Sequence, residues 1–170
     1  MERLEYDEFR ALFRSNRRAW HLELRDTYNV EGEDEPFDRF LRGEPDSFEW
    51  LREWLDFVST VTSAGTLIQR VRVVTEPHAD YTRFGFVVAP LAIKAGEDIR
   101  YLPRRDTADI EFPQEDLWLF DDDTLVWSVF SEDGRTGGFA REHDRGLTAH
   151  CRTVRDQVWA RATPYAEYVH

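Results

Sequence analysis

The sequence of 170 residues has few of the residues on which several common kinds of site depend. Its single cysteine, Cys151, excludes an internal disulfide and a metal site built from several thiolates. Lys94 is the only lysine, so nearly all of the 22 basic residues are Arg. No apolar run approaches the roughly 20 residues of a membrane-spanning helix. The charged first residues, MERLEYDEFR, predict no secretion signal.

The sequence does contain a surplus of acid and many aromatic residues. Its 34 acidic and 22 basic side chains give a formal net charge of -12. A nucleic-acid surface needs a basic face, and an anionic membrane attracts basic segments, so we expect neither as a direct partner. Because 41% of the residues are hydrophobic, the chain can bury a core of its own. These features predict an acidic, cytoplasmic domain.

The hydrophobic pattern predicts alternating helices and strands, which is typical of an α/β fold. Helices are expected over residues 1–20, 47–64, 76–95 with a break at Pro90, and 147–162, and strands over 21–25, 66–75, 98–102 and 117–130. Residues 31–45 are rich in acid, Pro and Gly and are expected to form an acidic loop. The hairpin at 117–130 is apolar on both faces, which places it centrally in the sheet. Residues 1–170 are therefore predicted to form a single α/β domain with a central mixed sheet flanked by helices.

The motifs of several common active sites are missing. No P-loop, dinucleotide-binding or nucleophile-elbow motif occurs, and the five His form no metal-ligand pair. The run Asp121-Asp122-Asp123 has the oxygen ligands that hard cations prefer. Adjacent residues of a tight turn point in different directions, however, so a solvated turn is the favoured interpretation. We expect no metal and no cofactor.

The distribution of Arg is more informative. Arg70 and Arg72 share one face of a predicted strand, and guanidinium groups hold carboxylates and phosphates bidentately. If neighbouring strands bring these cations together, they line a pocket; the alternative is a set of dispersed Arg–acid pairs. The candidate ligand-binding residues are Arg70, Arg72, Glu76, His78, Tyr81, Arg83, Arg100, Arg104, Arg105 and Asp121.

Several motifs occur in an order that resembles a known family. They are Trp20 to Asp26, Arg70 to Pro77, Asp80 to Phe84, Ala95 to Arg104, Leu117 to Asp122 and Pro164 to Tyr168. Together they resemble the actinobacterial domain-of-unknown-function family catalogued as six-eight-seven-nine. One departure is Gly85, where the family usually carries Glu. The family has no established activity that the resemblance could carry over. Its members are commonly encoded near helix-turn-helix regulators, which implies a regulatory or toxin–antitoxin-like setting. The preference for Arg over Lys agrees with a high-GC genome.

A weaker resemblance is to the phospholipase D-like fold, through Phe120-Asp121-Asp122 and the order of elements. That fold's catalytic motif places His two residues before Lys. Here Ala92 stands two residues before Lys94, so the H-x-K motif is absent. The resemblance therefore implies a degenerate fold without its usual chemistry.

Three functional hypotheses follow. The leading one is a non-catalytic regulatory or protein-interaction domain that works with a helix-turn-helix regulator or another protein. The alternative is a protein that binds a small anionic ligand or nucleotide, or a divergent phosphodiesterase with His78 as acid/base, in the Arg-lined pocket. The third, direct DNA binding through Arg14, Arg17 and Arg18, is disfavoured by the net charge. The oligomeric state is not predicted.

Overall fold

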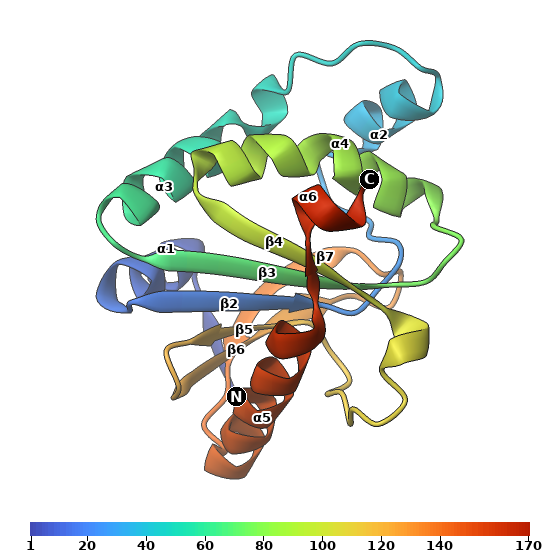
Figure 1. Cartoon of the computed structure of the whole chain (residues 1–170). Coiled ribbons are helices and arrows are strands. Elements are labelled where there is room, and N and C mark those ends of the chain that lie inside the picture. Colours follow the sequence, from blue (N-terminus) through green and yellow to red (C-terminus); the bar gives the residue numbers. More distant parts are fainter.

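One mixed sheet of eight strands organises the whole chain, in the order β1-β7-β6-β5-β2-β3-β4-β8. The computed structural model describes all residues, 1–170 (Figure 1). The strands are β1 (Glu2–Leu4), β2 (Arg18–Glu23), β3 (Leu67–Val74), β4 (Glu97–Pro103), β5 (Leu117–Phe120), β6 (Thr124–Phe130), β7 (Thr136–Arg141) and β8 (Thr163–Pro164). β2, β3 and β4 are parallel, and the remaining pairs are antiparallel.

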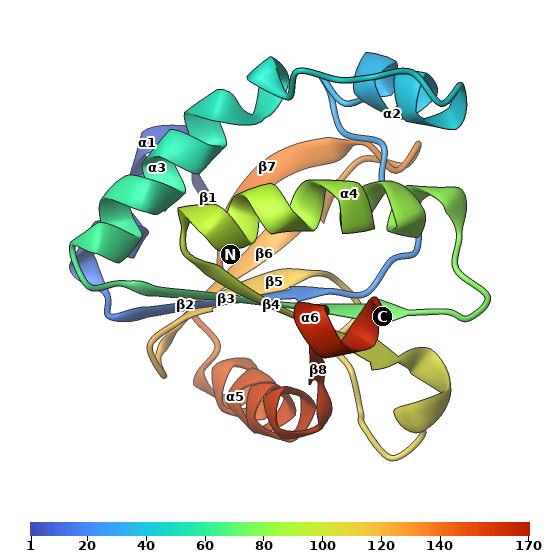
Figure 2. The ribbon, with the colours of Figure 1, turned by 45° about the horizontal axis from the view of Figure 1, so that its top comes forward.

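Helices cover both faces of this sheet. They are α1 (Tyr6–Ser15), α2 (Asp34–Leu41), α3 (Arg52–Ser63), α4 (Asp80–Ala95), α5 (Arg145–Arg161) and α6 (Tyr165–Tyr168), with 3-10 turns at Glu49–Leu51 and Arg104–Asp106. Figure 2 shows α1, α2, α3 and α4 on one side of the sheet and α5 on the other. The connections from β2 to β3 and from β3 to β4 step in the same direction, so their helices lie on the same face. No helix combines the length and apolar character that crossing a bilayer requires.

The alternation of side chains along β3 separates two cores. Val71 and Val73 point to the α5 face, where they join a cluster that includes Cys151 and Val158. On the opposite face, α1 and α3 bury an aromatic cluster around Phe13, which is fully buried. Arg70 and Arg72 occupy the positions of β3 between its apolar residues and therefore point to this second face.

The expected fold class is confirmed, including the central place of the hairpin formed by β5 and β6. Three expected segments differ in detail. The first helix, expected over residues 1–20, spans only Tyr6–Ser15, because Glu2–Leu4 pair as β1 with β7 and the residues from Arg18 pair as β2 with β3 and β5. Residues 31–45, expected to be a loop, contain α2, whose apolar side packs Phe37 and Phe40 against Phe84 of α4.

The third difference is in α4, which begins at Asp80 rather than at residue 76 and is not broken by Pro90. Proline has no N–H, so the carbonyl four residues earlier, on Phe86, loses its helical partner. The hydroxyl of Tyr165 donates to that carbonyl oxygen at 2.9 Å. A tertiary contact thus satisfies the group that the proline leaves free, and the helix continues to Ala95.

Candidate functional site

On the face of the sheet covered by α1 to α4, the polar residues gather where β2, β3 and β4 run side by side. Arg70 lies opposite His21 of β2, and Arg72 lies opposite Glu23. On β4, Glu97 lies opposite Ile68, which is on the same face of β3 as Arg70 and Arg72, so Glu97 points to that face too. These strands are parallel and adjacent, so residues distant in sequence become immediate neighbours.

Two Arg and two Glu form an ion cluster here, composed of Glu23, Arg70, Arg72 and Glu97. Arg70 donates to Glu23 and, through Nε at 3.1 Å, to Oε1 of Glu97. Nη1 of Arg72 lies 2.8 Å from Oε2 of Glu23. Both Glu residues are buried. Burial alone would raise the pKa of Glu23, but Arg72 and Arg70 outweigh it and lower that pKa to about 2.

Arg72 uses only part of its hydrogen-bonding capacity. Its Nη1 faces Glu23, while its Nε and Nη2 have no protein partner. Burial would lower the pKa of Arg72, but the charge of Glu23 more than compensates and raises it. Gly85 of α4 lies over this guanidinium: a Cβ at that position would be 3.7 Å from Cζ of Arg72. The absence of a side chain there leaves one side of the cation open.

Two cavities meet at Arg72. The first, which we call the α4 cavity, has a volume of about 230 Å³ and is bounded by Trp50, Trp54, Phe84 and Gly85. The second, the hairpin cavity, has a volume of about 360 Å³ and lies under the β6–β7 hairpin, which rises toward the helical layer in Figure 2. The residues common to both are Glu33, Trp54, Arg70, Arg72 and Tyr81. The ion cluster therefore forms the shared floor of a hollow with aromatic walls.

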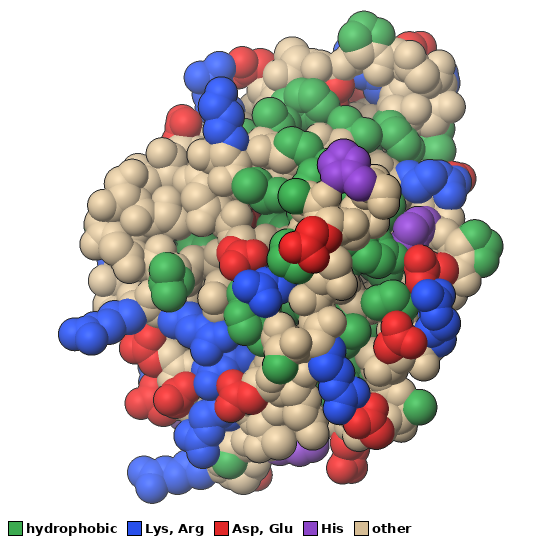
Figure 3. Space-filling model, viewed as in Figure 1, with side chains coloured by type: hydrophobic (Ala, Val, Ile, Leu, Met, Phe, Trp, Pro, Cys, Tyr) green, Lys and Arg blue, Asp and Glu red, His purple; other side chains and the backbone are tan.

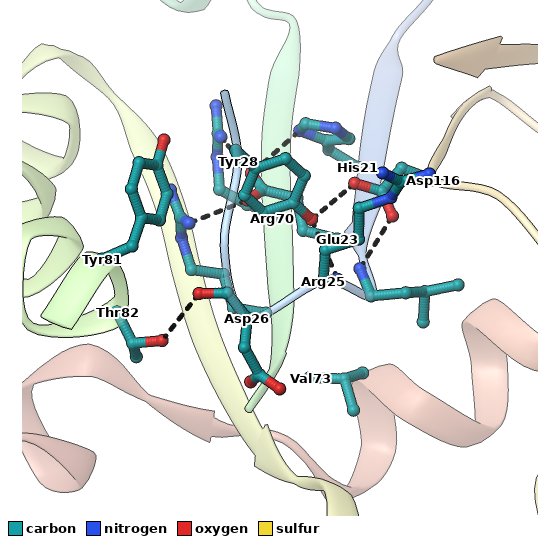
Figure 4. A network of polar contacts seen from close by, with 12 residues as sticks. His21, Glu23, Arg25, Asp26, Tyr28, Arg70, Val73, Tyr81, Thr82 and Asp116 are labelled. Atoms are coloured by element: carbon teal, nitrogen blue, oxygen red, sulfur yellow. Dashed lines mark hydrogen bonds and ion pairs between the residues drawn. The ribbon is translucent and has the colours of Figure 1, made fainter. Parts of the chain in front are cut away.

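Two tyrosine–carboxyl pairs border the hollow. Tyr81 donates to Oε2 of Glu33 at 2.9 Å, and Tyr28 donates to Oδ2 of Asp116 at 2.5 Å. Figure 4 shows Tyr28 in front of Arg70, with Tyr81 on one side and Asp116 on the other. Burial raises the pKa of Glu33 and raises that of Asp116 to about 6. Both carboxyls therefore hold a proton more readily than exposed ones do.

His21 lines the hairpin cavity as a neutral imidazole. Its ring stacks on Trp118 with the centroids 4.0 Å apart. Burial lowers its pKa to about 3, so it carries no proton charge near neutrality. Its Nδ1 is buried without a hydrogen-bond partner, and so is the hydroxyl of Tyr101, the neighbour of Arg72 on β4. Nδ1 of His21 lies 3.5 Å from the acceptor Oε1 of Glu23.

Three of the ten candidate residues lie in this hollow: Arg70, Arg72 and Tyr81. A second group, Glu76, His78, Arg104 and Arg105, lies beyond the carboxyl ends of β3 and β4. Here Arg105 pairs with Glu76. Nε2 of His78 is 2.7 Å from the hydroxyl of Tyr168. The two groups do not form one pocket.

Arg104 joins the strand ends rather than facing an open space. Its Nη2 donates to the carbonyl oxygens of Leu24 at 2.6 Å and Val73 at 3.1 Å, and its Nε donates to Thr75. These contacts hold the ends of β2 and β3 together.

The remaining three candidates lie apart from both groups. Arg83 is exposed and pairs with Asp80. Arg100 lies on the α5 face, with its guanidinium carbon 3.8 Å from the ring centre of Trp159. Asp121 lies at the opposite end of the sheet, where its carboxylate accepts the N–H groups of residues 17 and 18 at 3.0 and 2.9 Å. These placements give each of the three a partner within the protein.

Sequence reasoning missed His21, Glu23, Glu97 and Asp116. The strand alternation at 21–25 was visible, and it puts His21 and Glu23 on one face. A charge at an inward position of a strand requires a partner of opposite sign, and Arg70 and Arg72 were the natural candidates. The order of the strands, which local pattern does not determine, decides that pairing.

The surface outside the hollow carries mixed charge. Figure 3 shows acidic and basic groups interspersed on one face, with basic side chains gathered near the β5–β6 turn and the start of α5. In this region Nε of Arg18 donates to Gln69 at 2.5 Å. Arg14 lies over the ring of Phe57.

The chain belongs to the family described as Domain of unknown function (DUF6879), whose model matches residues 7–170. This match confirms the family indicated by the order of the sequence motifs. A comparison with curated proteins gave no match. The likeness to a phospholipase D-like fold stays a prediction.

Proposed function

We propose that this protein is a non-catalytic regulatory domain that binds a small anionic molecule beside Arg72 and transmits that binding to a protein partner. The observation that carries the proposal is the unused Nε and Nη2 of Arg72, a largely buried cation at the junction of two cavities. The Arg72 side chain is 19% exposed, so these two nitrogens are open to the cavities, where an anion can displace water and accept charge-assisted hydrogen bonds from them.

Another buried Arg shows what full pairing looks like in this fold. Arg155 is 4% exposed, and all three of its nitrogens have partners. Nε binds Asp156, Nη1 binds the carbonyl of Asp121, and Nη2 binds the carboxylate of Asp122. Arg72 differs from Arg155 in keeping two donors without a protein partner, and this difference supports a ligand-binding role.

The groups around the hollow suit binding better than catalysis. His21 is neutral, stacked and pressed against the protein interior, which disfavours it as a general acid. His78, the acid/base candidate from the sequence, contacts Tyr168 in the other group of residues. Tyr81, Tyr28 and Arg72 offer donors without an activated nucleophile beside them.

The proposed route to a partner runs through α2. Glu33, which accepts from Tyr81 inside the hollow, immediately precedes this helix. The outer side of α2 exposes Asp34, Glu35 and Asp38, which suits a basic surface on a partner such as a helix-turn-helix regulator. A ligand that changes the contact between Glu33 and Tyr81 would act directly on the first turn of α2.

Thermal-shift measurements test the binding step with separate sets of carboxylates, phosphate esters, nucleotides and amines. An anion present at 100 times its Kd should stabilise the protein by about 2.7 kcal/mol. The stabilisation should disappear in Arg72→Gln and persist in the matched control Arg105→Gln, whose side chain is exposed. Failure of every anion to stabilise the wild-type protein, or equal stabilisation of the Arg72→Gln variant, would refute the proposal.

A further inference from the structure

We infer that the ligand is an aromatic monocarboxylic acid, held by a bidentate carboxylate on Nε and Nη2 of Arg72 with its ring in the α4 cavity. This inference rests on the proposed function and narrows the class of anion. Three independent features carry it: the edge of the guanidinium that is free, the balance of charge in the hollow, and the shape of the space beside Gly85.

The first feature is the geometry of Arg72. Glu23 occupies Nη1, which leaves Nε and Nη2 as an intact pair. These two nitrogens direct parallel N–H groups along one edge of the planar guanidinium. A carboxylate presents two coplanar oxygens that match such an edge, giving two charge-assisted hydrogen bonds. A lysine at this position would supply the charge without the paired edge.

The second feature is the charge already present. The two Arg of the ion cluster face two carboxylates, Glu23 and Glu97, before any ligand enters. A second negative charge on the ligand would have no cation to pair with, and Glu33 and Asp116 would repel it. A single negative charge meets less repulsion from these carboxylates than a doubly charged group does. This balance favours a monoanion over a phosphate ester.

The third feature is the space. The α4 cavity has a volume of about 230 Å³, below the roughly 300–1,000 Å³ of sites for drug-sized ligands. Its walls include Trp50 and Phe84, whose rings are stacked with centroids 6.0 Å apart. Trp54 lies on the other side, with its Nε1 directed to Glu97 at 3.4 Å. One ring or a fused pair of rings fits these walls, whereas a nucleotide would have to extend from the α4 cavity into the hairpin cavity.

Gly85 connects the ring space to the cation. It lies within α4, where glycine is less favourable for the helix than alanine. Its place over Arg72 leaves the guanidinium open to the α4 cavity. A Glu introduced at position 85 would start 3.7 Å from Cζ of Arg72 and would bring its own carboxylate to that cation. Such a variant should compete internally with a ligand carboxylate.

The experiment is isothermal titration of the full chain with matched probes: phenylacetate, indole-3-acetate, phenylacetamide, phenyl phosphate, AMP and acetate. We expect phenylacetate or indole-3-acetate to bind at least about tenfold more tightly than the amide, the phosphate ester, AMP or acetate. Arg72→Lys should weaken the aromatic acids by roughly tenfold while the exposed control Arg105→Lys does not. Gly85→Glu should abolish binding, with circular dichroism used to verify its fold.

Each contrary result has a distinct meaning. Tighter binding of phenyl phosphate or AMP would overturn the monocarboxylate and leave the proposed function standing. Equal affinities for phenylacetate and phenylacetamide would overturn the bidentate carboxylate contact. Equal affinities for phenylacetate and acetate would overturn the role of the aromatic ring. An unchanged affinity in Arg72→Lys would overturn the role of the guanidinium edge. No binding of any anion would overturn both the inference and the proposed function.

Discussion

Replacing Asp116 with Asn should make the protein more stable at neutral pH and remove one component of its pH dependence. Asp116 is 2% exposed, and burial raises its pKa from 3.8 to about 6. Because the folded protein holds this proton more tightly than the unfolded chain, protonation of Asp116 stabilises the fold at low pH. That stabilisation is lost as the pH rises from about 4 through the folded pKa of about 6.

The magnitude follows from the size of the pKa change. At 1.36 kcal/mol per pH unit, ionised Asp116 opposes folding by up to about 3 kcal/mol above pH 7. Asn keeps an oxygen for the N–H of Leu24, which Asp116 accepts at 2.9 Å, and its amide can donate to Tyr28. Weaker, neutral hydrogen bonds should cost about 1 kcal/mol of that gain. We therefore expect Asp116→Asn to raise the free energy of unfolding by about 1–2 kcal/mol at pH 7.5.

The assay is urea denaturation followed by tryptophan fluorescence at pH 4.5, 5.5, 6.5 and 7.5, with the wild type, Asp116→Asn and the exposed control Glu132→Gln. The difference between Asp116→Asn and the wild type should be close to zero or slightly unfavourable at the lowest pH and should grow toward neutrality. Glu132→Gln should show no such trend, because its exposed carboxylate makes no ion pair in the structure. A constant loss of stability in Asp116→Asn across the whole range would refute the reasoning.

Four further predictions concern stability and reactivity. Gly85→Ala should raise the free energy of unfolding by about 1 kcal/mol, because its Cβ would make only an ordinary contact with Arg72; a loss of stability in urea denaturation would contradict this. Phe13→Ala should cost about 3–5 kcal/mol in the same assay, against a much smaller effect of Leu147→Ala, whose side chain is 42% exposed; similar losses would contradict the assigned core. Asp144→Ala should cost about 1 kcal/mol, because this carboxylate caps the first turn of α5, and Asp144→Asn should lose much less; equal losses would count against the cap. Burial raises the pKa of Cys151 to about 11, so Ellman's reagent should label the native protein slowly and the urea-unfolded chain rapidly; equal rates would contradict its burial.

The cation pair of the hollow could be found in the sequence, but its acidic partners could not. Strict alternation over 67–74 places Arg70 and Arg72 on one face, since side chains alternate along any strand. Glu23 and Glu97 come from strands that precede and follow β3 by tens of residues. Their contacts depend on strand order and register, which no local pattern encodes.

The wider Arg group separates in the structure because neighbouring residues of a strand point to opposite faces of the sheet. Arg100 and Tyr101 are adjacent in sequence, yet they point to opposite faces of β4. Arg100 contacts Trp159 on the α5 face, and Tyr101 lies on the face covered by α1 to α4. Arg104 and Arg105 follow the end of β4 and cannot turn back into the hollow. Residues that are close in the sequence around β4 therefore lie farther apart in the structure than their spacing suggested.

The sequence by itself determined the family, the α/β class, the central hairpin and the inward face of Arg70 and Arg72, because these depend on ordered motifs and on the short-range periodicity of apolar residues. Only the tertiary structure decided that Glu23 would occupy one edge of Arg72 while the other edge stayed free, and that Gly85 would lie over it. It also decided that Tyr165 would satisfy the carbonyl left by Pro90. Each of these outcomes joins groups that are distant along the chain, and their distances are fixed only when the helices pack on the sheet.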